Sequence, residues 1–223
     1  MPMEKTEGVT LKAVPYKDGE KILSVFSKEN GLATFIIKKL SLKKPELLNG
    51  ANLFCLSEFV YLKGQREIYF LKDLTLLNSH LFLREDLSYI EQAALMARAL
   101  CDSQLPNKKA PELYELFKKY LLKIPEFKNE LTLAYSFILK LLLHEGLLHL
   151  TGSCSRCPKQ TASLFQGEPL CQDHAPAYAL NFIPEEIELL KILAYSRSFS
   201  ELKNLTFPVF FKEKIWRIFQ EVI

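Results

Sequence analysis

The chain has 223 residues, which is enough for one large domain or two small ones. Hydrophobic residues make up 48% of it and charged residues 25%, a balance that supplies a packed core and excludes a disordered chain. Because the formal net charge is only +3, any affinity for nucleic acid must come from local clusters of basic residues.

No stretch of the sequence is apolar for long enough to suggest a membrane span. The most hydrophobic one, residues 131–150, is interrupted by Lys140, His144 and Glu145. The first ten residues lack the apolar core of a signal peptide. We therefore expect a soluble, cytoplasmic protein that does not bind a membrane.

Residues 8 to about 80 have the alternating apolar pattern of β-strands, interrupted by turn sequences such as Lys28–Gly31. About five short strands joined by tight turns are typical of a small closed β-barrel of the OB type, and an SH3-like barrel is the alternative. The predicted strand segments are 9–13, 22–26, 32–37, 51–62, 68–71 and 74–78.

A run of basic residues follows the third predicted strand. Residues 38–44 contain four lysines and no acid, so this exposed loop and a later basic turn could follow a phosphate backbone. Phe35, Tyr61 and Tyr69 could stack on bases, although barrel aromatics usually fill the core and a lysine run is usually a solvated loop. The candidate phosphate contacts are Lys38, Lys39, Lys43, Lys44, Lys63 and Arg66.

From about residue 84 the apolar period becomes that of a helix. The clearest example starts at Pro111, has apolar residues at helical spacing from Leu113 to Ile124, and ends at Pro125. We predict an α+β protein with an OB-type barrel domain at 1–80 and a helical domain at 81–223. The predicted helices are 87–101, 111–124, 131–146 and 184–194, then a short turn capped by Ser200 and a last helix around 215–219.

Four residues have the spacing of a metal site. Cys154 and Cys157 form a Cys-x-x-Cys pair, Cys171 and His174 form a Cys-x-x-His pair, and thirteen residues separate the pairs. Four protein ligands leave no open position for water or substrate, so we expect a structural Zn²⁺ rather than a catalytic one. The ion would order a zinc module at about residues 150–176, inserted between the third and fourth helices.

Two other interpretations of these cysteines stay open. They could be scattered core residues beside a surface histidine, or they could form disulfides, but three of only five cysteines within eighteen positions favour a metal. Cys55 and Cys101 lie far from this group in apolar sequence and are predicted to be buried hydrophobic residues. Three thiolates, a neutral imidazole and Zn²⁺ sum to a negative site, which Arg156 and Lys159 would partly offset.

The sequence gives little support to an enzyme. It has no Gly-rich phosphate loop, no G-x-S-x-G and no H-E-x-x-H motif. His144 and His149 are five positions apart, about 140° around a helix, so they do not face one target and are expected to cap helix carbonyls instead. We predict a non-enzymatic protein without catalytic residues.

The order of these features resembles the RecO family, bacterial DNA-repair and recombination mediators, over essentially the whole chain. Residues 7–23 are similar to the family's opening strand and its return, and Phe26–Gly31 is similar to its F-T-x-E-x-G hairpin. The lysine run and Cys154–Cys157 fall where the family has a basic loop and a C-x-x-C pair. The basic loop lacks the family's Gly and Arg, the fourth candidate ligand is His174 rather than Cys, and the chain is somewhat short.

The resemblance implies a protein that binds single- and double-stranded DNA, anneals complementary strands and is associated with the nucleoid. It implies RecR and the single-stranded DNA-binding protein as partners, with which it would load RecA. Annealing suits a cationic barrel, because neutralising two phosphate backbones reduces the repulsion that slows pairing. Two alternatives are a protein-interaction adaptor whose barrel binds a peptide and no nucleic acid, and a metal-dependent hydrolase with an open zinc position.

Overall fold

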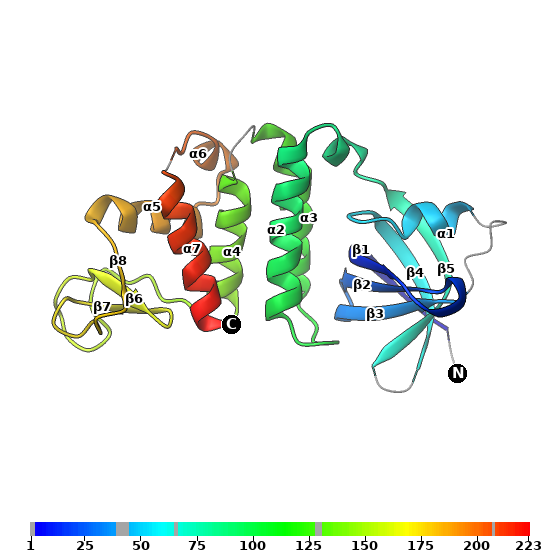
Figure 1. Ribbon diagram of the computed structural model, residues 1–223, viewed down its shortest axis with the longest axis horizontal. Helices are drawn as coiled ribbons and strands as arrows, with labels where there is room; N and C mark the ends of the chain where they lie inside the picture. The colour runs from blue at the N-terminus through cyan, green and yellow to red at the C-terminus, as the bar shows by residue number, and fades with distance from the viewer. Residues whose placement is uncertain (1–2, 39–44, 65–66, 128–130, 207) are drawn as a thin grey trace. The chain divides into compact units, whose positions relative to one another are not determined.

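The structure is a computed structural model that describes residues 3–38, 45–64, 67–127, 131–206 and 208–223. The chain divides into two compact units, residues 1–125 and 126–223. The first contains a β-barrel and two long helices, and the second contains further helices and a small sheet (Figure 1).

The N-terminal strands close into a barrel in the order β1-β2-β3-β5-β4 (Figure 1). β1 pairs with both β2 and β4, which closes the sheet, and β3 and β5 form the parallel pair among otherwise antiparallel neighbours. The prediction of an N-terminal OB-type barrel followed by helices is confirmed. The strands are β1 (Met3–Pro15), β2 (Lys21–Ser27), β3 (Gly31–Ile37), β4 (Leu56–Lys63) and β5 (Ile68–Asn78).

Aromatic side chains fill the interior of the barrel. The ring of Phe35 lies 5.1 Å from that of Phe59 and 5.2 Å from that of Tyr61, and the rings of Tyr61 and Tyr69 are 4.8 Å apart. At most 6% of Phe35, Tyr61 or Tyr69 is exposed. The suggestion that these three aromatics stack on bases is therefore wrong, and the alternative, that they fill the core, holds.

Two strand predictions also need correction. The segment 51–62 is not one strand, because α1 (Pro45–Gly50) and a turn through Phe54, whose φ is 63°, precede the start of β4. The segments 68–71 and 74–78 are one strand, β5. An irregularity in its pairing with β4, opposite Val60 and Tyr61, disturbs the alternation of its apolar residues and explains why the pattern suggested two segments.

Helices α2 (Leu87–Ser103) and α3 (Pro111–Lys123) belong to the same compact unit as the barrel. The ring of Phe26 on β2 lies 6.1 Å from that of Tyr114 and 6.3 Å from that of Phe117, so α3 covers part of the barrel's outer surface. Polar contacts tie the same elements together, since the Glu7 carboxylate accepts hydrogen bonds from the Tyr114 hydroxyl at 2.8 Å and the Lys118 ammonium at 2.6 Å.

The second unit is built around α4, which is buried along most of its length. Ser136 Oγ donates to the carbonyl of Leu193 at 2.6 Å, and Lys140 Nζ donates to those of Ala194 and Ser196 at 3.0 and 2.7 Å, which caps the end of α5. No helix among the described residues is long and apolar enough to cross a membrane. The helices are α4 (Thr132–His144), α5 (Pro184–Tyr195), α6 (Phe199–Lys203) and α7 (Val209–Val222).

A three-stranded antiparallel sheet between α4 and α5 was not predicted. Its order is β7-β6-β8, with β6 (Ser163–Phe165), β7 (Glu168–Leu170) and β8 (Leu180–Asn181). Gln166 and Gly167 join β6 to β7 with φ values of 49° and 77°, as in a type I′ hairpin turn. Strands of two or three residues are too short to leave an alternating pattern in the sequence.

Candidate functional site

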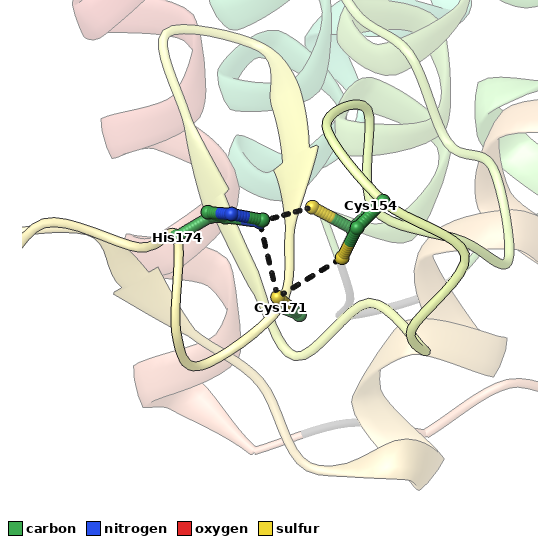
Figure 2. A group of neighbouring side chains, drawn as sticks. Cys154, Cys171 and His174 are labelled. Atoms are coloured by element: carbon green, nitrogen blue, oxygen red, sulfur yellow. Dashed lines mark hydrogen bonds between the residues drawn. The ribbon is translucent and has the colours of Figure 1, made fainter.

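The candidate metal ligands come together at one end of the small sheet. The first pair precedes β6, and the amide of Ser155 between its two cysteines donates to the carbonyl of Pro169 in β7 at 2.8 Å. The second pair begins where β7 ends, and the His174 amide donates to the Cys171 carbonyl at 3.1 Å. The β6–β7 hairpin thus brings the two pairs together, and Figure 2 shows Cys154, Cys171 and His174 pointing toward one another.

The distances within this group fit a shared tetrahedral metal ion. Zinc–sulfur bonds of about 2.3 Å and zinc–nitrogen bonds of about 2.0 Å would separate two sulfurs by about 3.8 Å, and a sulfur and a nitrogen by about 3.5 Å. Cys157 Sγ and Cys171 Sγ lie 3.7 Å apart, which is too long for a disulfide. His174 Nδ1 lies 3.4 Å from Cys154 Sγ and 3.5 Å from Cys171 Sγ, and all four ligand atoms lie within 4.8 Å of one another.

The backbone around the site favours ionised sulfur, as a metal requires. Burial opposes ionisation of Cys154, but hydrogen bonds from the amides of Arg156 and Cys171 outweigh it and lower the pKa of this thiol to about 6. At Cys157 a hydrogen bond from the amide of Lys159 lowers the pKa of the thiol. Burial and the neighbouring cysteines raise it by more, so the pKa of this thiol is raised overall. A divalent cation would favour the ionised sulfur at both Cys154 and Cys157, because its charge stabilises a thiolate.

The donor set suits Zn²⁺ in a structural role. Three thiolates and one imidazole would complete a tetrahedron around the ion without leaving a position for substrate. Lys159, one of the two basic residues expected to offset a negative site, forms an exposed ion pair with Asp173. Among the described residues, this is the one group of Cys, His, Asp or Glu side chains with the arrangement of a metal site.

Two of the six candidate phosphate contacts lie at described positions. Lys38 directly follows β3, and its Nζ lies 5.1 Å from the centroid of the Phe70 ring on β5. Lys63 ends β4 and forms an ion pair with Glu4 at 3.1 Å. β3 and β4 lie on either side of β5: Lys63 pairs with Tyr69 near the start of that strand, whereas Lys38 follows Ile36, the partner of Phe70, by two residues. The other four, Lys39, Lys43, Lys44 and Arg66, lie outside the described residues.

Phe70 is an aromatic residue that the sequence pattern did not single out. It lies between the core residues Tyr69 and Leu71, so alternation along the strand turns its side chain outward. The alternation of Tyr69, Phe70 and Leu71 was visible in the sequence. Deciding which of these aromatic residues faces outward requires the register of β5, and its irregular pairing with β4 obscured that register.

The three histidines outside the candidate metal group lie on different elements. His144 ends α4, whereas His149 lies 3.8 Å from the carboxylate of Glu168 on β7. The buried His80 donates a hydrogen bond from Nδ1 to the carbonyl of Phe54 at 2.7 Å, and burial lowers the pKa of its ring. Each of these three side chains thus has a separate structural environment.

The chain has a closed OB-type barrel followed by helices, with a Cys₃His group between the later helices. It is therefore an OB-barrel protein with a C-terminal helical part. The family model described as recombination protein O N terminal matches residues 1–80, and that described as recombination protein O C terminal matches residues 84–223. The chain therefore belongs to the RecO family of DNA repair proteins, as its sequence motifs predicted.

Curated relatives match along nearly the full chain. The DNA repair protein RecO of Chlamydia pneumoniae is 30% identical over 222 residues, covering 96% of this chain and 86% of that protein. The protein of the same name from Chlamydia trachomatis serovar L2 is 27% identical over 231 residues, with coverages of 97% and 90%. That from Caldanaerobacter subterraneus subsp. tengcongensis is 24% identical over 228 residues, with coverages of 98% and 91%.

Proposed function

We propose that the protein binds single- and double-stranded DNA and anneals complementary strands, acting as a non-enzymatic repair mediator. The observation that carries this proposal is the OB-type barrel of a RecO-family chain, with a lysine-rich segment leaving β3. Basic residues on such a barrel can neutralise two phosphate backbones at once and so reduce their repulsion. On this proposal RecR and the single-stranded DNA-binding protein are its partners in loading RecA, and it is cytoplasmic and associated with the nucleoid.

Fluorescence anisotropy with a labelled single strand at two salt concentrations tests DNA binding directly. We expect affinity to fall steeply with salt, since each released counterion adds to the slope of log K against log salt. Annealing of complementary oligonucleotides should proceed without ATP. If no oligonucleotide binds at low salt, the adaptor with a peptide-binding barrel becomes the better description.

The lysine segment provides a focused test of the phosphate contacts. Replacing Lys43 and Lys44 together with Glu should weaken binding at least about tenfold and reduce the salt slope, because two phosphate contacts become repulsive. The matched control is Lys191→Glu with Lys203→Glu, two basic positions in the second unit. Equal affinity and equal slope for the Lys43/Lys44 variant and the wild type would remove this segment from the binding surface.

We further propose that Cys154, Cys157, Cys171 and His174 hold a structural Zn²⁺. The sulfur and nitrogen distances and the absence of an open fourth position among these residues support this assignment. X-ray absorption should find three sulfurs and one nitrogen around the metal. An oxygen ligand would instead support the metal-dependent hydrolase.

The domain division proposed from sequence places the boundary near residue 80, with residues 81–223 forming the helical domain and residues 150–176 its zinc module. The family-model boundaries at residues 80 and 84 support this division, whereas the compact unit that contains the barrel extends to residue 125 and includes α2 and α3. Limited proteolysis followed by mass spectrometry would locate the first accessible boundary.

A further inference from the structure

Six apolar residues form a continuous row across the outer surface of the barrel. Each is the paired neighbour of the next, and β1 supplies both the first and the last, so the row crosses all five strands. In order around the barrel, the row consists of Val14, Ile22, Ile36, Phe70, Leu62 and Met3.

The row faces outward. Its members alternate along the strands with residues of the barrel core such as Leu23, Phe35 and Tyr61, and alternation sends neighbouring side chains to opposite faces. Met3 is 68% exposed and Val14 is 40% exposed, whereas the other four members are half-buried. Outward positions of a barrel in water are normally polar, so a contiguous apolar row indicates an interaction surface.

Lysines flank this row on both sides. Lys38 follows a row residue by two positions and Lys12 precedes one by two, so alternation places both on its face of the sheet. Lys72, the residue left unpaired by the irregularity in β5, is exposed two positions after Phe70. β1 and β3 are both antiparallel to β2, whereas β3 and β5 are parallel. Lys12 therefore lies on one side of the row, and Lys38 and Lys72 lie on the other. All three are exposed, and Lys38 Nζ lies over the Phe70 ring.

We propose that this row binds the unpaired bases of single-stranded DNA, with Phe70 as the stacking residue and the flanking lysines on the phosphates. The inference rests on the proposed function and deepens it, because it names the base as well as the phosphate as a recognised group. Apolar and aromatic surface between cations matches the alternation of base faces and phosphates along a single strand. A duplex keeps its base faces stacked on one another, so the row should distinguish single strands from duplexes.

An abasic oligomer separates base contacts from phosphate contacts. We expect the full chain to bind an oligothymidine of about 20 nucleotides at least about tenfold more tightly than an abasic deoxyribose-phosphate oligomer of equal length. Phe70→Leu should lose most of that preference while its salt slope stays as in the wild type. Leu77→Ala, an exposed leucine on β5 outside the row, is the matched control and should keep the preference.

A fluorescent variant reports stacking even if Phe70→Leu folds poorly. Trp216 is the chain's single tryptophan, so the double variant Phe70→Trp with Trp216→Phe carries its indole only in the row. Oligothymidine should quench this indole, and the abasic oligomer should not. The variant should also retain the base preference, because a larger aromatic ring still stacks.

The outcomes separate this inference from the proposed function. If the wild type binds neither oligomer, the proposed function fails. If the wild type binds both equally, or the fluorescent double variant binds thymidines without quenching, DNA binding stands and the row is not a base platform. A further outcome is that the wild type self-associates and that Phe70→Leu abolishes this self-association but keeps the base preference. That result would also overturn the inference, because the row would then bind a second copy of the chain.

Discussion

At the scale of single residues, the candidate metal site depends most directly on Cys154. Replacing it with Ser removes one of four ligands and leaves the other two cysteines and His174 without a complete tetrahedron. We expect bound zinc, measured by mass spectrometry, to fall below half of the wild-type content. The melting temperature should decrease by about 5 °C or more, since metal binding and local order are coupled.

The control for this change is Cys101→Ser, because Cys101 is half-buried on α2 and belongs to the other compact unit. Its zinc content should equal that of the wild type. Unchanged metal content and melting temperature in Cys154→Ser would remove the zinc assignment.

Alanine substitutions at two glycines of the second unit can distinguish the cost of backbone strain from the cost of a steric clash. Gly167 and Gly146 have φ values of 77° and 71°, so alanine at either position costs about 1 kcal/mol in backbone strain. A Cβ on Gly167 would lie 1.9 Å from the Leu147 carbonyl oxygen, whereas a Cβ on Gly146 meets no atom within 4 Å.

We therefore expect Gly167→Ala to destabilise the protein by about 3 kcal/mol or more, and Gly146→Ala by only about 1 kcal/mol. Urea unfolding followed by circular dichroism measures both. Equal losses would mean that the β6–β7 hairpin does not approach residue 147 as closely as the structure has it.

At the scale of elements, Glu7 joins the barrel to α3. Burial alone would raise its pKa, but hydrogen bonds from Lys118 and Tyr114 hold the pKa of this carboxyl below its ordinary value of 4.5. A carboxyl whose pKa is lower in the folded chain contributes stability above its unfolded pKa and loses that contribution as pH falls.

Glu7→Gln should therefore destabilise the protein at pH 7 by about 1–2 kcal/mol, and the difference from wild type should shrink as pH falls below about 4.5. Chemical unfolding at several pH values measures the difference. A difference independent of pH would show that the carboxylate charge contributes nothing to the attachment of α3.

Elements with a long regular period were predictable from sequence, and those fixed by tertiary contacts were not. The apolar period from Leu113 to Ile124 predicted α3 correctly, because one face of that helix packs against the barrel and is therefore apolar. By contrast, α1 has six residues and depends on packing against β5, where a Cβ on Gly50 would lie 1.9 Å from Leu74. The four candidate metal ligands were recognisable from their spacing alone, but the outward orientation of Phe70 required the register of β5.

At the scale of the whole molecule, the first compact unit extends to Pro125 and includes α2 and α3. Phe26 is completely buried and contacts the rings of Tyr114 and Phe117. A fragment of residues 1–80 would expose this apolar surface, whereas a fragment of residues 1–125 would keep it covered.

We therefore expect the 1–125 fragment to unfold in one cooperative thermal transition and to remain monomeric. The 1–80 fragment should aggregate or melt at least about 10 °C lower, because it lacks the helix that covers Phe26. Calorimetry and light scattering compare the two. A 1–80 fragment as stable as the longer one would mean that α3 adds nothing to the barrel.

The contact between Phe26 and α3 also has a consequence for synthesis on the ribosome. Tyr114 and Phe117 emerge roughly ninety residues after Phe26, a delay of about 5–20 s at ordinary elongation rates. During that interval the nascent barrel presents an uncovered aromatic side chain, and a chaperone acting on nascent chains would find its target there.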